Sequence, residues 1–337
     1  MTLTDRFGRV HRDLRISLTD HCNLRCTYCM PAEGVPWLPR TTLLTPEELM
    51  RIVRIAVGEG IEEVRLTGGE PLLRPDCVDV VAAIASVEPR PEISITTNGI
   101  GLARLAEPLK RAGLARVNVS LDTLKPDRFH QLTRRNRLAD VLAGIAAADA
   151  TGLHPVKLNA LQLRGINDDE APDLLAFAMD HGYELRFIEQ MPLGPSGQWT
   201  RSGMVAAEEI LSRLEGAFKL VARPGTERGS SPAELWDVAP GKVDGVEHPG
   251  GTVGVIASIT RPFCGDCDRT RLTADGQVRS CLFAREETDL RSLLRAGADD
   301  DTIADAWRAA MWGKQPGHGV DDPSFLQPSR TMSAIGG

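Results

Sequence analysis

The first half of the chain alternates between short runs of β-type residues and longer amphipathic segments. The β-type runs are LRISLT (14–19), VRLTGG (64–69), EISITTNG (92–99), RVNVSLD (116–122), VKLNALQL (156–163) and YELRFIEQM (183–191). Six strands separated by helices predict a parallel sheet with right-handed crossovers. The pattern alone fits an incomplete barrel of six β/α units and a doubly wound sheet equally well. In both architectures ligands gather at the carboxyl ends of the strands.

The segment 45–60 shows the helical pattern most clearly. Its apolar residues recur at the spacing of one helix face, Thr45 can cap the helix, and Pro46 suits the first turn. Glu48 completes a capping box with Thr45. We therefore expect a helix that begins just after Thr45 and ends at Gly58 to Gly60.

The regular alternation ends near residue 191. A loop-like stretch follows, then a predicted helix at 205–216, a Gly- and Pro-rich region, a predicted hairpin at 271–281 and a helical stretch at 289–314. We therefore divide the chain into a β/α part, residues 1–191, and an irregular α+β region, residues 192–337.

Composition narrows the classes of function. The chain of 337 residues is 42% hydrophobic and 25% charged, which suits a globular protein with a large core. Its net charge of -7 argues against binding nucleic acid or an anionic membrane through the whole surface. No apolar segment approaches the ~20 residues that span a bilayer. The expected location is the cytoplasm, where the seven cysteines would stay reduced and suit metal or redox chemistry.

Three of these cysteines, Cys22, Cys26 and Cys29, form a C-x3-C-x2-C motif directly after the first predicted strand. A structural zinc site normally takes four protein ligands, so three thiols leave one position open. Iron–sulfur clusters are also held by thiolates, and a cubane with three protein thiolates keeps one iron free for another ligand. The motif favours the cluster over zinc.

A second set of three, Cys264, Cys267 and Cys281, lies on a Pro/Gly-rich loop and at the far end of the predicted hairpin. The C-x2-C pair is compatible with half of a zinc ribbon, although no histidine lies at ribbon spacing. A second cluster with an open iron is the other interpretation. Cys77 lies on an apolar helix face and is expected to be a buried small side chain.

The motif CNLRCTYC (22–29) resembles the signature of the radical S-adenosylmethionine (SAM) enzymes, and TGGEP (67–71) resembles their SAM-binding stretch. Further stretches are similar to the GTP 3',8-cyclase family of molybdenum-cofactor biosynthesis. They are DLRISLTDHCNLRCTYCMP (13–31), VRLTGGEPLLR (64–74), LNALQLRGINDDE (158–170), LRFIEQMPLG (185–194), FCGDCDRTRLTADGQVRSCLF (263–283) and the terminal GG. The resemblance implies an incomplete (β/α)6 TIM-type barrel with an irregular C-terminal α+β region.

The resemblance also implies the reaction. Two [4Fe–4S] clusters and SAM serve as cofactors, and GTP is converted to 3',8-cyclo-7,8-dihydro-GTP. A 5'-deoxyadenosyl radical takes the ribose 3'-hydrogen, and the resulting carbon radical attacks C8 of guanine. A one-electron donor protein and a cyclic pyranopterin monophosphate synthase, which acts next, are the implied partners. The expected assembly is a monomer or a homodimer.

Site residues follow from the same resemblance. No G-x4-G-K-[ST] loop occurs, so side chains must meet the triphosphate; the arginine fork suits phosphate oxygens, and three of the basic residues fall on or near predicted strand ends. The implied cluster ligands are the six cysteines named above. The implied SAM contacts are Tyr28, Gly69, Ser120 and Met191, and the GTP contacts are Arg15, Arg65, Thr96, Lys157, Arg269 and Arg271. The last two arginines and the tail glycines Gly336 and Gly337 are the implied catalytic residues, the tail entering the active site.

Two other functions remain open from the residues. One is a radical SAM enzyme that acts on a peptide or another small molecule and uses the second cluster as an electron relay. The other is a zinc-stabilised binding protein with no catalytic activity. The basic residues favour a phosphorylated substrate over the first alternative, and a brown colour that bleaches on reduction would exclude the second.

Overall fold

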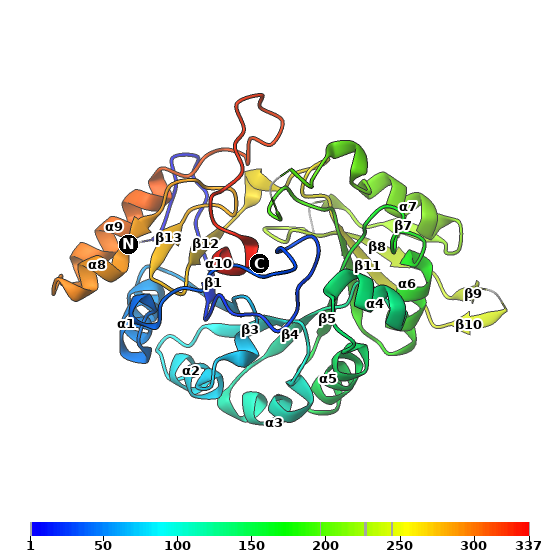
Figure 1. Cartoon of the computed structure of the whole chain (residues 1–337), viewed down its shortest axis with the longest axis horizontal. Coiled ribbons are helices and arrows are strands. Elements are labelled where there is room, and N and C mark those ends of the chain that lie inside the picture. Colours follow the sequence, from blue (N-terminus) through cyan, green and yellow to red (C-terminus); the bar gives the residue numbers. More distant parts are fainter. Residues whose placement is uncertain (1, 196, 226–227, 244, 337) are drawn as a thin grey trace.

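The computed structural model describes residues 2–195, 197–225, 228–243 and 245–336, and a curved parallel sheet forms its centre (Figure 1). Six neighbouring strands follow chain order. They are β1 (Asp13–Ser17), β2 (Glu63–Thr67), β3 (Glu92–Thr97), β4 (Arg116–Ser120), β5 (Val156–Leu161) and β6 (Glu184–Ile188). All six predicted strands are confirmed.

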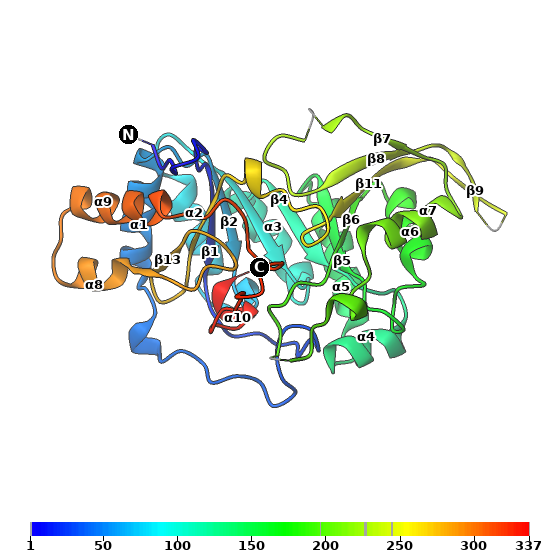
Figure 2. The same cartoon turned by 90° about the horizontal axis from the view of Figure 1, so that it is seen from above.

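The helices of this part cover the outer, convex side of the sheet (Figure 1). They are α1 (Pro46–Gly58), α2 (Cys77–Ala85), α3 (Leu102–Ala112), α5 (Leu138–Ala150) and α6 (Ala171–Asp180), whereas α4 (Pro126–Thr133) lies with the loops at the carboxyl ends of the strands (Figure 2). A doubly wound sheet would carry helices on both faces. The incomplete barrel is therefore the correct alternative.

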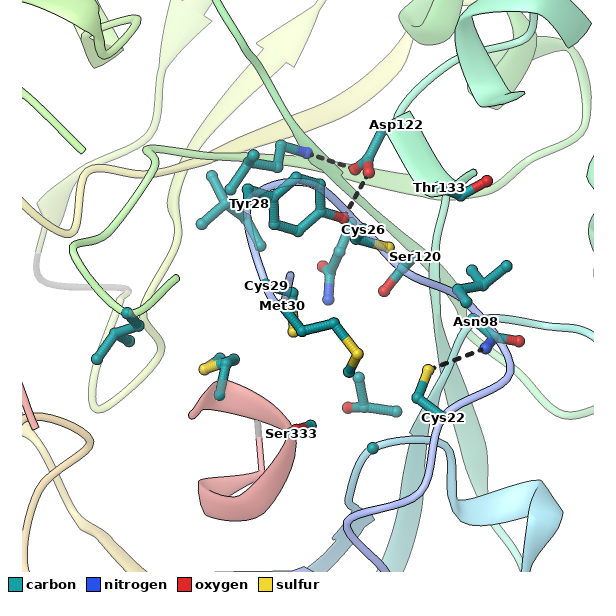
Figure 3. Close-up of a pocket in the computed structure, with 18 of the residues that line it drawn as sticks. Cys22, Cys26, Tyr28, Cys29, Met30, Asn98, Ser120, Asp122, Thr133 and Ser333 are labelled. Atoms are coloured by element: carbon teal, nitrogen blue, oxygen red, sulfur yellow. Dashed lines mark hydrogen bonds between the residues drawn. The ribbon is translucent and has the colours of Figure 1, made fainter. Parts of the chain in front are cut away.

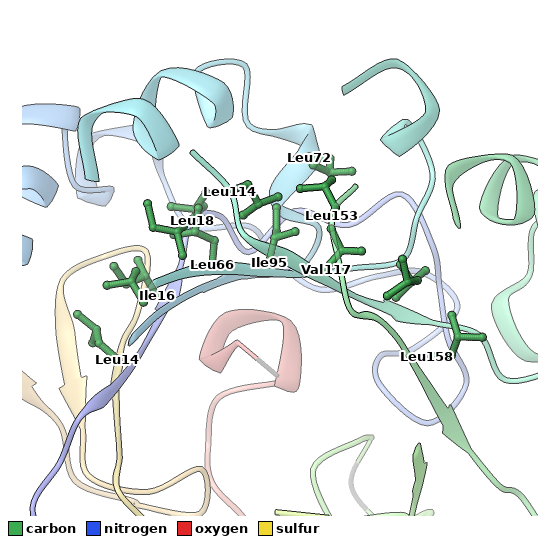
Figure 4. Packing of buried hydrophobic residues seen from close by; sticks show 14 of the residues in the cluster. Leu14, Ile16, Leu18, Leu66, Leu72, Ile95, Leu114, Val117, Leu153 and Leu158 are labelled. Atoms are coloured by element: carbon green, nitrogen blue, oxygen red, sulfur yellow. The ribbon is translucent and has the colours of Figure 1, made fainter. Parts of the chain in front are cut away.

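The hydrophobic core lies between the sheet and these helices. Leu66, Ile95 and Val117 are fully buried on the helix side of the strands (Figure 4). Successive side chains of a strand point to opposite faces. Arg65 therefore faces the barrel interior, because its neighbour Leu66 faces the helices. The alternation that builds the core also lines the interior with polar residues.

Helix α1 begins as its sequence predicts. The Thr45 hydroxyl accepts a hydrogen bond from the Glu48 backbone N–H (3.2 Å), and the Glu48 carboxylate accepts one from the Thr45 N–H (2.9 Å). This capping box satisfies two backbone donors at the helix end. Within the described residues, no helix is both long and apolar enough to cross a lipid bilayer.

The C-terminal region extends both edges of the same sheet. Strand β12 (Arg269–Leu272) pairs in parallel with β1, and β11 (Gly251–Ile256) pairs in parallel with β6. The described sheet has twelve strands in the order β14-β13-β12-β1-β2-β3-β4-β5-β6-β11-β8-β7. The outer strands are β13 (Gln277–Arg279), β14 (Thr288–Asp289), β8 (Glu234–Val238) and β7 (Leu220–Ala222); β9 (Gly241–Val243) and β10 (Val246–His248) form a separate hairpin.

The remaining helices are α7 (Ala207–Glu215), α8 (Leu290–Arg295), α9 (Asp300–Trp312) and the short α10 (Met332–Ile335). Short 3₁₀ turns occur at Arg40–Thr42, Pro71–Leu73, Arg201–Gly203 and Cys264–Asp266. The predicted helix at 205–216 and the predicted hairpin at 271–281 are confirmed, but the stretch 289–314 forms two helices. Gly297 breaks it with a positive φ of 81°, and Asp299 caps the second helix by accepting the Thr302 N–H.

The last described residues of the chain lie inside the barrel. Helix α10 lies at the centre of the arc of strands in one view and on their concave side in the perpendicular view (Figures 1 and 2). The tail therefore stands next to the carboxyl ends of the strands, where the sequence places the functional loops.

Candidate functional site

A cavity of about 240 Å³ opens among the loops that follow the strands (Figure 3). All three cysteines of the first motif line it, as do Tyr28, Gly69, Ser120 and Met191, the four predicted SAM contacts. Thr96, a predicted GTP contact, also lines it. Residues up to 311 positions apart in the chain, from Cys22 to Ser333, therefore share one cavity.

The first cysteine loop is held by backbone contacts to the end of α4. The N–H of Arg25 donates to the Thr133 carbonyl (3.0 Å), and that of Thr27 to the Leu132 carbonyl (2.9 Å). The Arg25 guanidinium donates to the Cys22 carbonyl (2.8 Å) and lies 5.4 Å from the centre of the Trp37 ring. The loop thus has a fixed shape.

The thiols of this loop suit a metal cluster better than a role as free nucleophiles. Burial raises the pKa of Cys22, raises that of Cys26 well above its ordinary value, and raises that of Cys29 to about 12, with neighbouring thiols adding to the effect on the last two. Bound metal supplies the positive charge that ionises such thiols. All seven cysteines, each a described residue, are free of disulfides.

The glycines of the TGGEP motif are required by the close approach of the cysteine loop. A Cβ on Gly68, whose φ is 152°, would lie 2.4 Å from the Thr19 carbonyl oxygen. A Cβ on Gly69 would lie 2.3 Å from that of His21. The Gly69 N–H donates to the Thr19 carbonyl at 2.7 Å. The turn and the cysteine loop are therefore in direct backbone contact.

Glu70 connects the ends of β2 and β3. Its fully buried carboxylate accepts hydrogen bonds from the Leu72 N–H (3.0 Å), the Thr97 hydroxyl (2.7 Å) and the Asn98 N–H (2.7 Å). Burial raises the pKa of Glu70 to about 7, although these three donors lower it. The Asn98 side chain donates to Asn23 (2.7 Å) and so reaches the cysteine loop.

Asp122 fixes Tyr28, which stands between two cysteines of the first motif. Its carboxylate accepts hydrogen bonds from the Tyr28 hydroxyl (2.6 Å) and the Leu161 N–H (2.9 Å) (Figure 3). Burial raises the pKa of Asp122 to about 6, and the Tyr28 contact opposes that rise. Sequence reasoning missed Asp122 as a site residue. The available signal was its place two residues after Ser120, at the end of the fourth strand.

Three predicted GTP contacts form a row across neighbouring strands. Arg15 of β1 pairs in register with Arg65 of β2 on one side and with Arg271 of β12 on the other. Burial and then the neighbouring arginines lower the pKa of Arg15 and of Arg271, each to about 9. Asp13 is 3.6 Å from Arg15. The row is a buried concentration of positive charge that an anionic ligand would stabilise.

The position of these residues differs from expectation. Arg15 and Arg65 are the middle residues of five-residue strands, and Lys157 is the second residue of β5, so none of the three lies at a carboxyl end. Lys157 contacts Glu184 (2.9 Å), and Arg186 lies 3.5 Å from the same carboxylate. The basic residues therefore extend deeper into the barrel than the cavity beside the cysteines.

Glu63, which stands two residues before Arg65, has a clear structural role. Its carboxylate accepts a hydrogen bond from Arg116 (3.0 Å), and Arg116 also pairs with Glu92. These contacts join the amino ends of β2, β3 and β4. Glu63 therefore forms its ion pair with Arg116, which is not part of the arginine row. The positive charge of Arg65 remains available to a ligand.

The second set of cysteines borders the arginine row. Cys264 and Cys267 lie at the turn before β12, and Arg269 lies 4.5 Å from the centre of the Phe263 ring. Burial raises the pKa of Cys264; it also opposes ionisation of Cys267, but Arg269 and Lys314 lower the pKa of Cys267 overall. Cys281 lies close enough to affect Cys264. In the described part of the chain, no three His, Cys, Asp or Glu side chains are gathered tightly enough to hold a single metal ion.

The C-terminal tail reaches the floor of the site. The Gly336 carbonyl accepts a hydrogen bond from Arg271, and Gly336 has a φ of 82°. A Cβ on this residue would lie 2.4 Å from the Thr67 hydroxyl and 2.8 Å from that of Ser17. Met332 and Ser333 line the cavity, and Figure 3 shows Ser333 beside the cysteines. Gly337 lies outside the described residues.

Comparisons with known proteins agree with this geometry. The model of the Radical SAM superfamily matches residues 16–178, and that of Molybdenum Cofactor Synthesis C matches residues 183–320. The GTP 3',8-cyclase of Streptomyces coelicolor is 63% identical over 336 residues, which cover 99% of this chain and 96% of that protein. The GTP 3',8-cyclase of Mycolicibacterium smegmatis is 60% identical over 338 residues, 99% of this chain and 92% of that protein.

Among solved structures, Streptococcus suis SuiB bound to S-adenosylmethionine superposes with a TM-score of 0.56. The match covers 89% of this chain and 69% of SuiB at 15% identity, so it concerns the fold alone.

Proposed function

Because the chain belongs to the GTP 3',8-cyclase family of radical SAM enzymes, we propose that its two cysteine triads hold two [4Fe–4S] clusters. The chain is an enzyme of molybdenum cofactor biosynthesis that uses SAM and an iron–sulfur cluster and acts on GTP. Cys22, Cys26 and Cys29 bind the first cluster. The observation that carries this assignment is the single cavity lined by these thiols and by the SAM contacts.

When bound, the cluster and SAM would supply the radical chemistry that removes the ribose 3'-hydrogen and lets the sugar carbon bond to C8 of guanine. The protein has to position SAM and GTP and to exclude water. Tyr28, held by Asp122, and Met191 form walls of the SAM cavity. Leu24, Phe129 and Leu161 add apolar surface, which keeps water away from a reactive radical.

The arginine row binds the triphosphate of GTP. Arg15, Arg65 and Arg271 are adjacent across the sheet, and Arg269 and Lys157 add positive charge. Burial makes each guanidinium costly without an anion, and a phosphate accepts its paired N–H groups. Thr96 contacts the nucleotide from the cavity wall. These groups select a phosphorylated substrate over a peptide.

Cys264, Cys267 and Cys281 would hold the second cluster, which would supply a binding point for the guanine base. Gly336, which Arg271 holds, closes the site from the tail. We expect a one-electron donor protein to reduce the first cluster and a cyclic pyranopterin monophosphate synthase to take the product. The enzyme acts as a monomer or homodimer in the cytoplasm, in agreement with seven unpaired thiols.

GTP deuterated at the ribose 3' position tests this function. Anaerobically reconstituted, reduced protein is mixed with SAM and the labelled GTP, and the released 5'-deoxyadenosine is analysed by mass spectrometry. Deuterium in the nucleoside is the expected result. Cleavage of SAM without transfer of the label would point to another substrate, and no cleavage by fully loaded protein would contradict the radical mechanism.

Cysteine variants test the role of the second cluster. In Cys264→Ala or Cys281→Ala we expect SAM cleavage to continue without coupling and GTP cyclisation to stop, because the base loses its anchor. Methionine and the cyclised nucleotide are quantified in the same reaction. Unchanged cyclisation would instead favour the interpretation that the C-x2-C pair belongs to a structural zinc site.

A further inference from the structure

A buried lysine contacts the second cysteine loop and has no part in the function described so far. Lys314 follows helix α9, and only 2% of its surface is exposed. Its ammonium donates to the Arg269 carbonyl (2.8 Å) and the Cys267 carbonyl (3.2 Å), and lies 3.5 Å from the Cys267 sulfur. A buried ammonium needs compensating contacts, and all three of these acceptors belong to residues 267 to 269.

The same ammonium is backed by two fully buried polar residues from the start of the chain. His11 Nδ1 lies 3.5 Å from Lys314 Nζ, and His11 Nε2 lies 3.3 Å from a carboxylate oxygen of Asp5. An ammonium can only donate, so Nδ1 presents its lone pair to Lys314 and the ring proton is on Nε2, towards Asp5. These groups therefore form a chain that runs from Asp5 through His11 and Lys314 to Cys267. Along it, each hydrogen-bond donor faces an acceptor.

Arginine at position 9 secures the other end of the loop. Its guanidinium donates to the Cys264 carbonyl (2.5 Å) and to the Gln315 carbonyl (2.8 Å), and it pairs with Asp5. Arg9 contacts the second cysteine loop through a backbone carbonyl, whereas Lys314 also contacts a thiol. Arg9 therefore provides a purely structural comparison for Lys314.

From these contacts we propose that Lys314 is a positioning residue for the second iron–sulfur cluster, fixing the Cys267 thiolate and stabilising its negative charge. The inference rests on the proposed second cluster. Hydrogen bonds to ligand sulfurs and local charge set the reduction potential of such clusters. A cation at the sulfur favours the reduced form, which carries more negative charge, and so raises the potential.

The test uses full-length protein in which Cys22, Cys26 and Cys29 are replaced by Ser, so that only the second cluster gives a signal. Lys314→Met removes the charge and keeps the length, Lys314→Arg keeps the charge, and Lys219→Met changes an exposed lysine as the matched control. After anaerobic reconstitution, iron and sulfide are counted and the midpoint potential is measured by titration monitored with electron paramagnetic resonance. Far-ultraviolet circular dichroism reports folding.

We expect Lys314→Met to lower the midpoint potential by about 59 mV for each tenfold loss of preference for the reduced form, and Lys314→Arg to retain most of the parental value. Lys219→Met should match the parent. Loss of cluster iron in Lys314→Met with unchanged circular dichroism would also support the proposal. If that variant fails to fold, Lys314→Arg is compared with Lys314→Gln in the same titration.

Two results would overturn the proposal. An unchanged potential and iron content in Lys314→Met would show that the lysine acts only through the two carbonyls, as Arg9 does. A parent protein that binds no cluster would remove the proposed second cluster itself, and this outcome is visible before any lysine variant is made.

Discussion

Individual buried carboxylates determine how firmly the first cysteine loop is held. Asp122 and Glu70 come from different strand ends, and both accept hydrogen bonds that fix groups around the cavity. Neither is a predicted cluster ligand. Their effect on the reaction is therefore indirect, through the shape of the SAM cavity.

Replacing Asp122 by Ala should loosen Tyr28. Alanine can accept neither of the two hydrogen bonds that the carboxylate now accepts and leaves both donors unsatisfied, so we expect a loss of about 2–4 kcal/mol in stability. SAM affinity should fall because Tyr28 forms a wall of its cavity. Thermal melting and equilibrium dialysis with SAM measure the two effects. Tyr28→Phe removes the other partner and should give a similar loss of affinity; normal SAM binding in both variants would refute this role.

Glu70 should make the stability of the protein depend on pH. Its folded pKa of about 7 lies above the ordinary 4.5, so the folded chain holds an extra proton between these values. The stabilisation is fully present below about pH 4.5 and is lost as the pH rises through about 7. Across this range the stability of the wild type relative to Glu70→Gln should fall by on the order of 3 kcal/mol. Melting curves of both proteins from pH 5 to 8 test this, and parallel pH profiles would contradict it.

At the residue scale the sequence identifies candidate ligands but not the side chains that support them. The cysteines are recognisable because their spacing is local. The roles of Lys314 and Asp122 depend on contacts with residues that lie 47 and 94 positions away in the sequence. A lone lysine near the end of a helix gives no sign that it will be buried beside a thiol.

At the scale of elements, Glu189 joins three parts of the chain. It follows β6 and is fully buried, and its carboxylate accepts hydrogen bonds from the Ala207 N–H (2.8 Å), the Ile259 N–H (2.8 Å) and the Thr260 N–H (2.9 Å). Ala207 is the first residue of α7, and Ile259 and Thr260 precede the second cysteine loop.

Glu189→Gln should therefore destabilise the C-terminal region. The NH2 group of the amide would face backbone N–H groups that now donate to the carboxylate. These donors would lose their acceptor, at a cost of about 2–4 kcal/mol. We expect a lower melting temperature and lower iron content, with the loss confined to the proposed second cluster. Glu215→Gln, an exposed change at the end of α7, is the control. Equal melting temperatures for the two variants would contradict the role of Glu189.

The elements of the β/α part could be predicted because their patterns are local: strand runs, an N-terminal capping box and helix faces. The strands that pair with β11 and β12 could not be predicted from the sequence. Arg269 pairs with Asp13 across 256 positions, and nothing near either residue indicates that the sheet will be extended there. The split between α8 and α9 was available from Gly297, which stands inside an otherwise helical pattern.

At the scale of the whole molecule, the tail completes the barrel interior. Gly336 touches residues of β1 and β2 and is held by an arginine of β12, so three strands converge on the chain end. The sequence predicted a tail that enters the site, but its packing against Ser17 and Thr67 required the folded chain.

Gly336→Ala should displace the tail. Its Cβ would meet two hydroxyl groups at 2.8 Å or less, and its positive φ disfavours alanine. We expect formation of the cyclised nucleotide to fall at least about tenfold, which corresponds to about 1.4 kcal/mol, while SAM cleavage continues. Product and methionine are quantified together. Gly319→Ala is the matched control, because Gly319 has a φ of 69° with no atom near the added Cβ. Equal turnover in both variants would rule out this role of the tail.

The two-sided extension of the sheet has a consequence for synthesis of the protein. When β6 has left the ribosome, the backbone groups at the outer edges of β1 and β6 have no partners until β11 and β12 emerge. At about 5–20 residues per second, this delay lasts on the order of ten seconds. Unpaired strand edges can template aggregation during that time. The nascent chain should therefore depend on chaperones that cover exposed edges, and a gene truncated after residue 191 should yield an aggregating product.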